Sequence, residues 1–321
     1  MATNKSRRRF LTLSGLGVTA AAVGGCAYSM TRPIPQLPPP GSSRGPVSAR
    51  IGNRTKLHMF QTGWVAVKRE HKAFCGPASL RYPAIMASQS WTEWMPIKAF
   101  AIEHPDGLFV VDTGETVQVF QPDYTACDTG TGLFYRRNLQ FALREQDELG
   151  PQMRRLGLDP DRVSKVIMTH LHSDHMGGMR YFPRAEFLVS ETARNGHTGA
   201  LMCRIPGSLS IRTTSLASSA VGVFNLCHQV TADASISIVP TPGHADGHQS
   251  VLMQDGGASV CIVGDAAFSL DQITSGEIGG IVASVPDARA SAKALKQQFE
   301  AFGTIMLPTH DPGNAERLKA S

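Results

Sequence analysis

The sequence predicts an α/β fold, because short runs rich in β-branched residues alternate with longer stretches that have helical spacing. The helix-like stretches are residues 138–156 and 287–302, and glycine pairs such as Gly177 and Gly178 mark breaks between elements. The strand-like runs are residues 58–67, 97–104, 108–112, 163–168, 185–189, 235–239, 249–253, 258–263 and 304–308.

The chain begins with the pattern of an export signal. Residues 6–11 carry a twin-arginine pattern, and the apolar run that follows, residues 11–23, is too short to span a bilayer as a permanent helix. We therefore expect residues 1–26 to be a twin-arginine signal peptide and the folded protein to be exported to the periplasm or to the membrane. Residues 23–26 resemble a lipoprotein box, so a lipid anchor at Cys26 and a soluble periplasmic form both remain open.

A proline-rich linker is expected after the signal, over residues 27–50, and the folded domain over residues 51–321. The whole chain has a net charge of +5, but seven lysines and arginines and no acidic residue precede residue 51. The domain itself is therefore slightly acidic, with a net charge of −2. This distribution argues against nucleic acid as a partner, because a nucleic-acid-binding protein carries its positive charges on the folded domain.

Four side chains that can bind metal lie within six residues, directly after the strand-like run 163–168. They are His170, His172, Asp174 and His175. Imidazole and carboxylate groups are ligands for zinc, manganese, iron or cobalt. A catalytic zinc ion needs only three protein ligands, so four donors at one strand end predict more than one ion.

Three further donors, His244, Asp265 and His310, each come just past another strand-like run. Separate strands can in this way bring side chains to one edge of a sheet. Two ions held there would activate water and stabilise an oxyanion, so these residues predict a hydrolase with Asp174 and Asp265 as catalytic residues. We expect the first ion between His170, His172 and His244, the second between Asp174, His175 and His310, and Asp265 as the bridge.

The His-x-His-x-Asp-His cluster and the separated His, Asp and His are similar to the defining pattern of the metallo-β-lactamase superfamily. The resemblance covers most of residues 57–312, and all seven donor positions are filled. It implies an αββα sandwich, in which two β-sheets pack face to face with helices outside. It also implies that Asp112, in an Asp-Thr-Gly turn, lies beneath the metal site; a simple turn at the end of a strand is the alternative.

The carboxylate at Asp265 separates branches of this superfamily. Zinc β-lactamases have a cysteine or no bridging carboxylate at that position, whereas lactonase, thioesterase and phosphotriesterase-like branches keep the aspartate. Residues 96–103 and 241–250 look most like the N-acyl-homoserine lactonase family.

This resemblance implies a hydrolase that binds two divalent ions, zinc with manganese, iron or cobalt as alternatives. It would open small-molecule lactones, with N-acyl-homoserine lactones and quorum quenching as the first expectation, and Asp174 or water would protonate the leaving alkoxide. A phosphotriesterase-like or thioesterase hydrolase of the same fold is the alternative. A hypothesis from a different functional class is a non-catalytic or redox di-iron protein. The oligomeric state is open, and a homodimer is one option.

Two positions near the donors need interpretation. The lactonases commonly have a tyrosine three residues after the bridging aspartate, and this chain has Phe268 there, which has no hydroxyl to donate. Either the metals alone assist the carbonyl, or the substrate differs, or Phe268 is an apolar wall of the pocket. His248 could orient a metal ligand or be a buried histidine at the start of a strand.

Three segments lie outside the predicted core. Residues 68–95 and 115–137 contain aromatic side chains that could line a substrate pocket or cover a sheet edge. Residues 196–232, rich in glycine, serine and threonine, are expected to be a lid or a surface excursion. The aromatic residues of the first two segments are Phe74, Tyr82, Trp91, Trp94, Phe120, Tyr124, Phe134 and Tyr135.

The six cysteines include no Cys-x-x-Cys pair, which argues against a zinc ribbon. Cys261 lies in an apolar run and is predicted to be a buried thiol. An oxidising compartment would allow a disulfide among Cys75, Cys127, Cys203 and Cys227, which the sequence does not assign. The histidines expected to be structural or surface residues are His58, His71, His104, His197 and His228.

Overall fold

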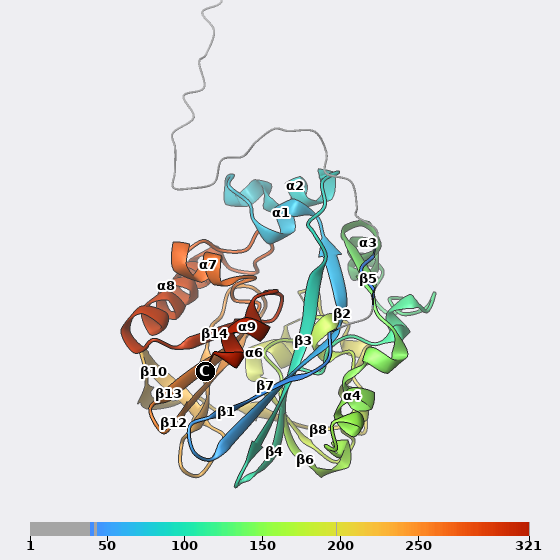
Figure 1. The fold of residues 1–321 in the computed structure, drawn as a ribbon. Coiled ribbons are helices and arrows are strands. Elements are labelled where there is room, and N and C mark those ends of the chain that lie inside the picture. The colour runs from blue at the N-terminus through green and yellow to red at the C-terminus, as the bar shows by residue number, and fades with distance from the viewer. Residues whose placement is uncertain (1–38, 42–43, 197, 321) are drawn as a thin grey trace, which may run out of the picture. The chain divides into compact units, whose positions relative to one another are not determined.

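Two β-sheets lie face to face between outer layers of helices in the computed structural model, which describes residues 39–41, 44–196 and 198–320 (Figure 1). The predicted αββα sandwich is thereby confirmed. The expected signal peptide, residues 1–26 with Cys26, lies outside the described residues, as does most of the expected linker. No helix within the described ranges has both the length and the apolar character that crossing a membrane requires.

The first sheet has eight strands in the order β1-β2-β3-β4-β6-β7-β8, and β5 pairs with β2 beside this path. Strands β4, β6, β7 and β8 pair in parallel, whereas β1 to β4 form antiparallel pairs. The strands are β1 (Val47–Ile51), β2 (Thr55–Val67), β3 (Met95–His104), β4 (Gly107–Val111), β5 (Leu139–Ala142), β6 (Val163–Ile167), β7 (Glu186–Ser190) and β8 (Ser210–Thr214).

The second sheet has six strands in the order β14-β13-β12-β11-β10-β9. All its pairs are antiparallel except β13 with β14, which run in parallel. The strands are β9 (Ala217–Val221), β10 (Phe224–Gln229), β11 (Ile236–Pro240), β12 (Gln249–Asp255), β13 (Ala258–Gly264) and β14 (Ile305–Pro308).

The main core fills the space between the sheets, where Phe100 and Phe109 of the first sheet meet Ile238 and Val251 of the second. Each such buried side chain contributes about 1.5–3 kcal/mol to stability. Alternate residues of the same strands point outward and are buried under helices, as Cys261 of β13 is. Because both faces are covered, these strands are almost continuously apolar, which is why their sequence runs were recognisable.

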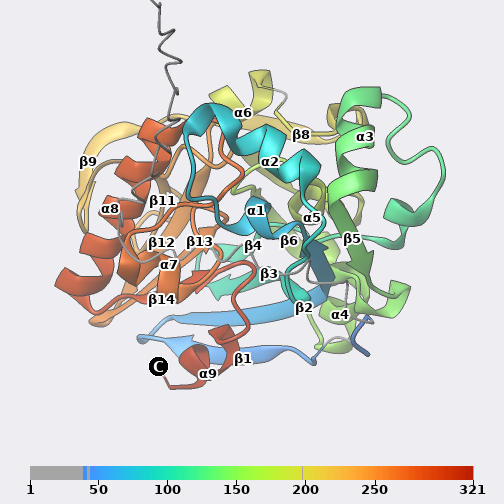
Figure 2. The same cartoon turned by 90° about the horizontal axis from the view of Figure 1, so that it is seen from above.

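Helices cover the two outer faces (Figures 1 and 2). Helix α4 (Leu149–Arg155) packs Leu149 and Met153 on the first sheet, while α7 (Leu270–Ser275) and α8 (Val285–Phe302) cover the second. The predicted helix 287–302 is confirmed as α8, whose N-cap Ser284 accepts a hydrogen bond from the backbone N–H of Asp287. The shorter helices are α1 (Arg69–Lys72), α2 (Arg81–Ala87), α3 (Thr129–Asn138), α5 (Ser173–Met176), α6 (Glu191–Asn195) and α9 (Asn314–Lys319).

The structure corrects three expectations. The predicted helix 138–156 is wrong over its first part, because residues 139–142 pair with β2 as strand β5, and this tertiary pairing overrides local helix propensity. The folded body begins earlier than residue 51, since Val47 already pairs with Met59. The region 196–232 is more than a lid: β8 extends the first sheet, and β9 and β10 extend the second.

Candidate active site

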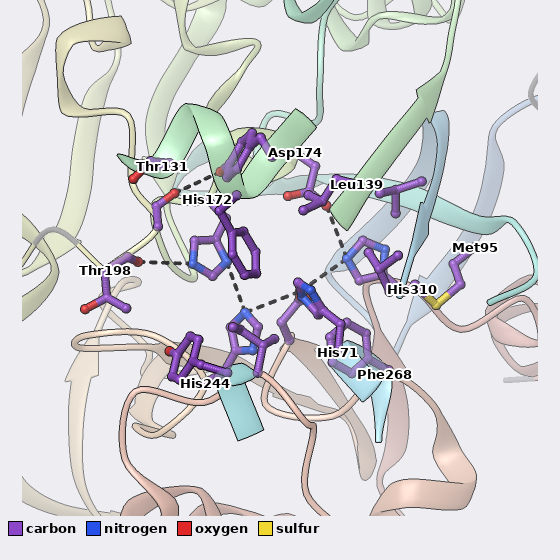
Figure 3. Close-up of a pocket in the computed structure, with 18 of the residues that line it drawn as sticks. His71, Met95, Thr131, Leu139, His172, Asp174, Thr198, His244, Phe268 and His310 are labelled. Carbon is purple, nitrogen blue, oxygen red and sulfur yellow. Dashed lines mark hydrogen bonds and ion pairs between the residues drawn. The ribbon is translucent and has the colours of Figure 1, made fainter. Parts of the chain in front are cut away.

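The seven predicted donors converge where strands β6, β11, β13 and β14 end. His170, His172, Asp174 and His175 lie on the loop and short helix α5 that follow β6. The other three follow the strands of the second sheet, so loops from both sheets meet at one site. Figure 3 shows the side chains of His172, Asp174, His244 and His310 directed toward one another.

The first predicted set, His170, His172 and His244, has its ring nitrogens close together. His172 Nδ1 lies 3.0 Å from His170 Nε2 and 3.1 Å from His244 Nε2. Burial holds the pKa of His170 and of His244 well below the usual value, so both rings are neutral and present lone pairs. Three neutral nitrogens facing one point form a suitable site for a cation.

The second predicted set, Asp174, His175 and His310, also clusters, and Asp265 reaches both sets. His310 Nε2 lies 3.3 Å from Asp174 Oδ2 and 3.2 Å from Asp265 Oδ2. Asp265 Oδ1 is 3.3 Å from His175 Nε2, and its Oδ2 is 3.6 Å from His244 Nε2 of the first set. A carboxylate between two donor clusters is the arrangement expected of a bridging ligand.

Unpaired polar atoms show that these residues fit metal ions. His175 Nε2 and Asp265 Oδ1 are buried 3.3 Å apart, and neither makes a hydrogen bond among the described residues. Burying such atoms unpaired costs about 1–3 kcal/mol each, and a divalent cation would pair with both. Nitrogen and oxygen donors alone suit zinc, manganese, iron and cobalt, so they leave the identity of the metal open.

Asp112 lies beneath the site and orients it. Its carboxylate accepts hydrogen bonds from the backbone N–H of Thr169 at 2.8 Å, from Thr169 Oγ1 at 2.7 Å and from His175 Nδ1 at 2.7 Å. The bond to Nδ1 leaves His175 Nε2 free to face the donor cluster. These contacts favour a role for Asp112 under the site over a simple turn.

Backbone carbonyls orient two more of the rings. His310 Nδ1 donates to the carbonyl of Pro96 at 2.9 Å, and His172 Nε2 to that of Thr198 at 3.2 Å. In each ring the opposite nitrogen therefore faces the cluster. Pro96 begins the segment that resembled the lactonases, and its backbone carbonyl supports His310.

His248 places the backbone that carries Asp265. Its Nε2 accepts a hydrogen bond from the Asp265 N–H at 3.0 Å, and its Nδ1 donates to the Thr241 carbonyl at 3.1 Å. Gly264 has φ +65°, and a Cβ there would lie 2.6 Å from His248 Nε2. His248 is thus a buried histidine directly before β12, and it also supports the predicted ligand Asp265. Both interpretations of this residue therefore hold.

A cavity of about 230 Å³ opens onto the donors. Its remaining walls are mostly apolar, and Phe134, Phe268 and Ile281 belong to one hydrophobic cluster there. Phe268 is buried, and its ring centroid lies 5.6 Å from that of His310. The apolar residues of the wall are Val65, Val67, Met95, Phe134, Leu139, Phe268 and Ile281.

The two aromatic-rich segments contribute to this cavity only in part. Tyr82, Phe134 and Tyr135 line it. Trp91 instead packs under the ammonium group of Lys68, and Phe120 is exposed. Some aromatic residues of these two segments therefore line the cavity, whereas others lie outside it.

Sequence analysis missed several polar residues of the cavity, namely Thr131, Thr198 and, most notably, His71. His71 was expected to be structural or superficial, yet its ring lines the cavity near the donors. No spacing pattern could have found it, because α1 belongs to a segment without a motif. His58, His104 and His228 instead hydrogen-bond away from the cavity, to Glu103, Ser235 and the carbonyl of Ser215, and His197 lies outside the described residues.

A disulfide joins two loops that border the cavity. Cys127 bonds to Cys203, with their Cα atoms 6.4 Å apart, which supplies a pairing that the sequence left open. Next to it, Tyr135 Oη donates to the carbonyl of Gly199 at 2.8 Å. Cys261 is a buried free thiol, as predicted, and burial raises its pKa to about 12.

Glu115 supports the loop of the donors from below and allows a prediction. Burial raises its pKa to about 8, against 4.5 for an ordinary glutamate, so the folded protein binds an extra proton between these pH values. Stability should therefore fall as pH rises from about 5 to 8. In Glu115→Gln this part of the decline should vanish, with a gain of about 1 kcal/mol or more at pH 8. Thermal melts of metal-loaded protein measure it.

The control for this experiment is Glu145→Gln, which changes an exposed glutamate. It should leave the pH dependence of stability as in the wild type. Parallel pH profiles for wild type and Glu115→Gln would contradict the assignment of a neutral Glu115.

Comparison with known proteins shows the family. The model of the metallo-beta-lactamase superfamily matches residues 127–310. N-acyl homoserine lactonase AttM of Azorhizobium caulinodans is 27% identical over 230 residues, which cover 68% of this chain and 82% of AttM.

Solved structures show the same fold. A mutant of AiiA from Bacillus thuringiensis with N-decanoyl-L-homoserine bound at the active site has a TM-score of 0.65 at 20% identity, covering 84% of this chain and 97% of that chain. AidC, a dizinc quorum-quenching lactonase, has a TM-score of 0.59 at 15% identity, covering 84% and 91%. With its family match over more than half its length and its αββα sandwich, the chain belongs to the metallo-β-lactamase superfamily.

Proposed function

We propose that this protein is a dinuclear metal-dependent hydrolase that opens lactone rings, and that N-acyl-homoserine lactones are its substrates. One observation carries the proposal: seven metal-binding side chains converge at a cavity whose other walls are mostly apolar. An N-acyl-homoserine lactone matches this cavity, because it has a polar ring at one end, which would lie at the donors, and an apolar chain at the other, which would lie along the apolar walls. The class of enzyme does not depend on the exact substrate. The chain belongs to the metallo-β-lactamase superfamily and is related to lactonases, so it is a metal-dependent hydrolase of ester or lactone bonds.

The residues that would hold the ions are the two sets described above, with Asp265 between them. Two bound divalent ions, zinc being our first expectation, would supply Lewis acidity at the substrate carbonyl and lower the pKa of the attacking water. The protein itself fixes the rings of His175 and His310 through Asp112 and Pro96, and the backbone of Asp265 through His248. It also excludes bulk water, because nearly all of these side chains are buried.

Asp174 is placed to move the proton. Its carboxylate lines the cavity and lies 3.3 Å from His310 Nε2. It can take the proton of the attacking water and pass it to the alkoxide oxygen that leaves when the ring C–O bond breaks. Ring opening then yields a neutral hydroxyl and a carboxylic acid, and the acid releases the second proton of the water to solvent to become a carboxylate.

The phenyl ring of Phe268 is the reason to propose substrates other than lactones as an alternative. The wall beside His244 and His310 has a phenyl ring where the lactonase family commonly has a phenol. A substrate with a better leaving group, such as a phosphotriester or a thioester, needs less help at its carbonyl or phosphoryl oxygen. A phosphotriesterase-like or thioesterase activity is therefore the alternative proposal.

A substrate panel tests the proposed function. Metal-loaded protein is assayed with short- and long-chain N-acyl-homoserine lactones, simple γ- and δ-lactones, a paraoxon-type triester, a glutathione thioester and a cephalosporin. We expect the highest kcat/KM on the acyl-homoserine lactones. Turnover of the triester or thioester without turnover of any lactone would contradict the proposal, and bound iron without hydrolysis would favour the redox reading.

A Phe268→Tyr variant tests the missing hydroxyl. A phenol in this wall should raise kcat/KM on acyl-homoserine lactones by about tenfold, the value of one added hydrogen bond in the transition state. Phe134→Tyr, which adds the same hydroxyl farther along the wall, is the matched control. No gain from Phe268→Tyr would show that the metals and the other residues already stabilise the oxyanion fully.

We also propose that the protein works outside the cytoplasm, exported through the twin-arginine signal in residues 1–26, either as a soluble periplasmic protein or with a lipid anchor at Cys26. The Cys127–Cys203 disulfide supports this, because disulfides persist in oxidising compartments. Cell fractionation tests export, and globomycin sensitivity separates lipidation at Cys26 from a soluble periplasmic form. Retention of the full-length chain in the cytoplasm would contradict the proposal.

A further inference from the structure

His71 is a buried polar group in an otherwise apolar part of the cavity wall. The residue is 8% exposed and lines the cavity, and its buried Nδ1 has no hydrogen-bond partner among the described residues. A buried nitrogen without a hydrogen-bond partner is unfavourable. Such a group calls for a partner that arrives with the substrate.

The ring of His71 stands between the donors and the apolar end of the cavity. It contacts Phe268 edge-on, with ring centroids 6.3 Å apart, and Phe134 at 6.0 Å. Phe268 in turn contacts His244 and His310, so His71 and Phe268 form the part of the cavity wall that adjoins the donor cluster (Figure 3). A substrate with its reacting carbonyl at the donors would place its next functional group beside His71.

The backbone that carries His71 is held in place before substrate binds. The backbone carbonyl of His71 accepts a hydrogen bond from the N–H of Ile281 at 2.9 Å. Gly280 packs so closely that a Cβ there would lie 1.7 Å from the carbonyl oxygen of Glu70. Helix α1 is thus fixed against the loop between α7 and α8, and a binding group fixed in advance loses little entropy on binding.

We propose that His71 hydrogen-bonds the amide group that links the lactone ring to the acyl chain, and so selects amide-substituted lactones over alkyl-substituted ones. This inference rests on the proposed function and makes it more specific. Burial lowers the pKa of His71 to about 3, so the ring is neutral at physiological pH. A neutral imidazole has one N–H donor and one acceptor lone pair, which can pair with the C=O or the N–H of an amide.

Two lactones of equal length test the inference. One is N-hexanoyl-homoserine lactone, and the other is a γ-butyrolactone that carries an alkyl chain of matched length on the same ring carbon, without the amide. The wild type should prefer the amide substrate. His71→Phe, which keeps a flat ring without nitrogen atoms, should reduce the ratio of the two kcat/KM values about tenfold.

Two further variants make the result specific. His71→Gln keeps a donor and an acceptor and should restore much of the ratio. His228→Phe, at a histidine of strand β10 that is bonded to Ser215, should leave the ratio unchanged. Bound metal and melting temperature are measured for each variant, so that misfolding or loss of metal is not mistaken for lost recognition.

The outcomes separate this inference from the proposed function. An unchanged ratio in His71→Phe, or equal losses on both substrates, would overturn the role of His71 while lactone hydrolysis stands. The same holds if the wild type hydrolyses the alkyl lactone and shows no preference for the amide. Hydrolysis of neither lactone by the wild type would overturn the proposed function, and the inference with it.

Discussion

Replacing Asp265 with alanine is expected to lower kcat/KM for lactones about 10³-fold or more and to reduce bound metal from two equivalents to one or fewer. The carboxylate is the only predicted donor whose two oxygens approach both sets, with Oδ1 toward His175 and Oδ2 toward His244 and His310. Without it, Asp174 is the only carboxylate left among the seven predicted donors, and no anion lies between the two sets to offset a second cation. Metal analysis and steady-state kinetics on the same preparation measure both effects.

Asp271→Ala is the matched control for this experiment, since it removes an exposed carboxylate six residues along the chain. Its metal content and activity should equal those of the wild type. Two tightly bound equivalents of metal in Asp265→Ala would show that Asp265 is no bridge.

The second large effect is expected at Asp112. Asp112→Ala leaves the Thr169 N–H and His175 Nδ1 without their acceptor in a fully buried place, which should destabilise the protein by about 3 kcal/mol or more. Asp112→Asn keeps the shape but presents an amide to His175. It should weaken metal binding about 10–100-fold.

Chemical denaturation of both Asp112 variants and metal titration of Asp112→Asn measure these losses. Asp123→Asn, at an exposed aspartate, is the control and should change neither quantity. Wild-type metal affinity in Asp112→Asn would mean that backbone contacts alone orient His175, and the account of the support beneath the site would then be wrong.

The sequence allowed the donor set to be predicted because its chemistry is local. Four donors occupy one short loop, and His244, Asp265 and His310 each follow a strand that is apolar on both faces. Such strands are recognisable because burial on two sides removes the polar alternation. The two-sheet layering came from the family resemblance and not from the strand pattern.

Other features depend on contacts between distant segments and could not be predicted in that way. Strand β5 exists because residues 139–142 pair with β2, although the local sequence continues a helix-like pattern. The Cys127–Cys203 bond joins positions 76 residues apart, and no spacing rule selects that pair. His71 reaches the cavity only because its helix is fixed against residues 280 and 281.

The central claim, that two metal ions are needed to open a lactone, is tested most directly by adding zinc to metal-free protein while its hydrolysis of N-hexanoyl-homoserine lactone is followed. Activity should be negligible without metal and should rise until about two equivalents of zinc per chain have been added, and a chelator should reverse the rise. Activity that is complete at one equivalent, or that persists in metal-free protein, would contradict the account.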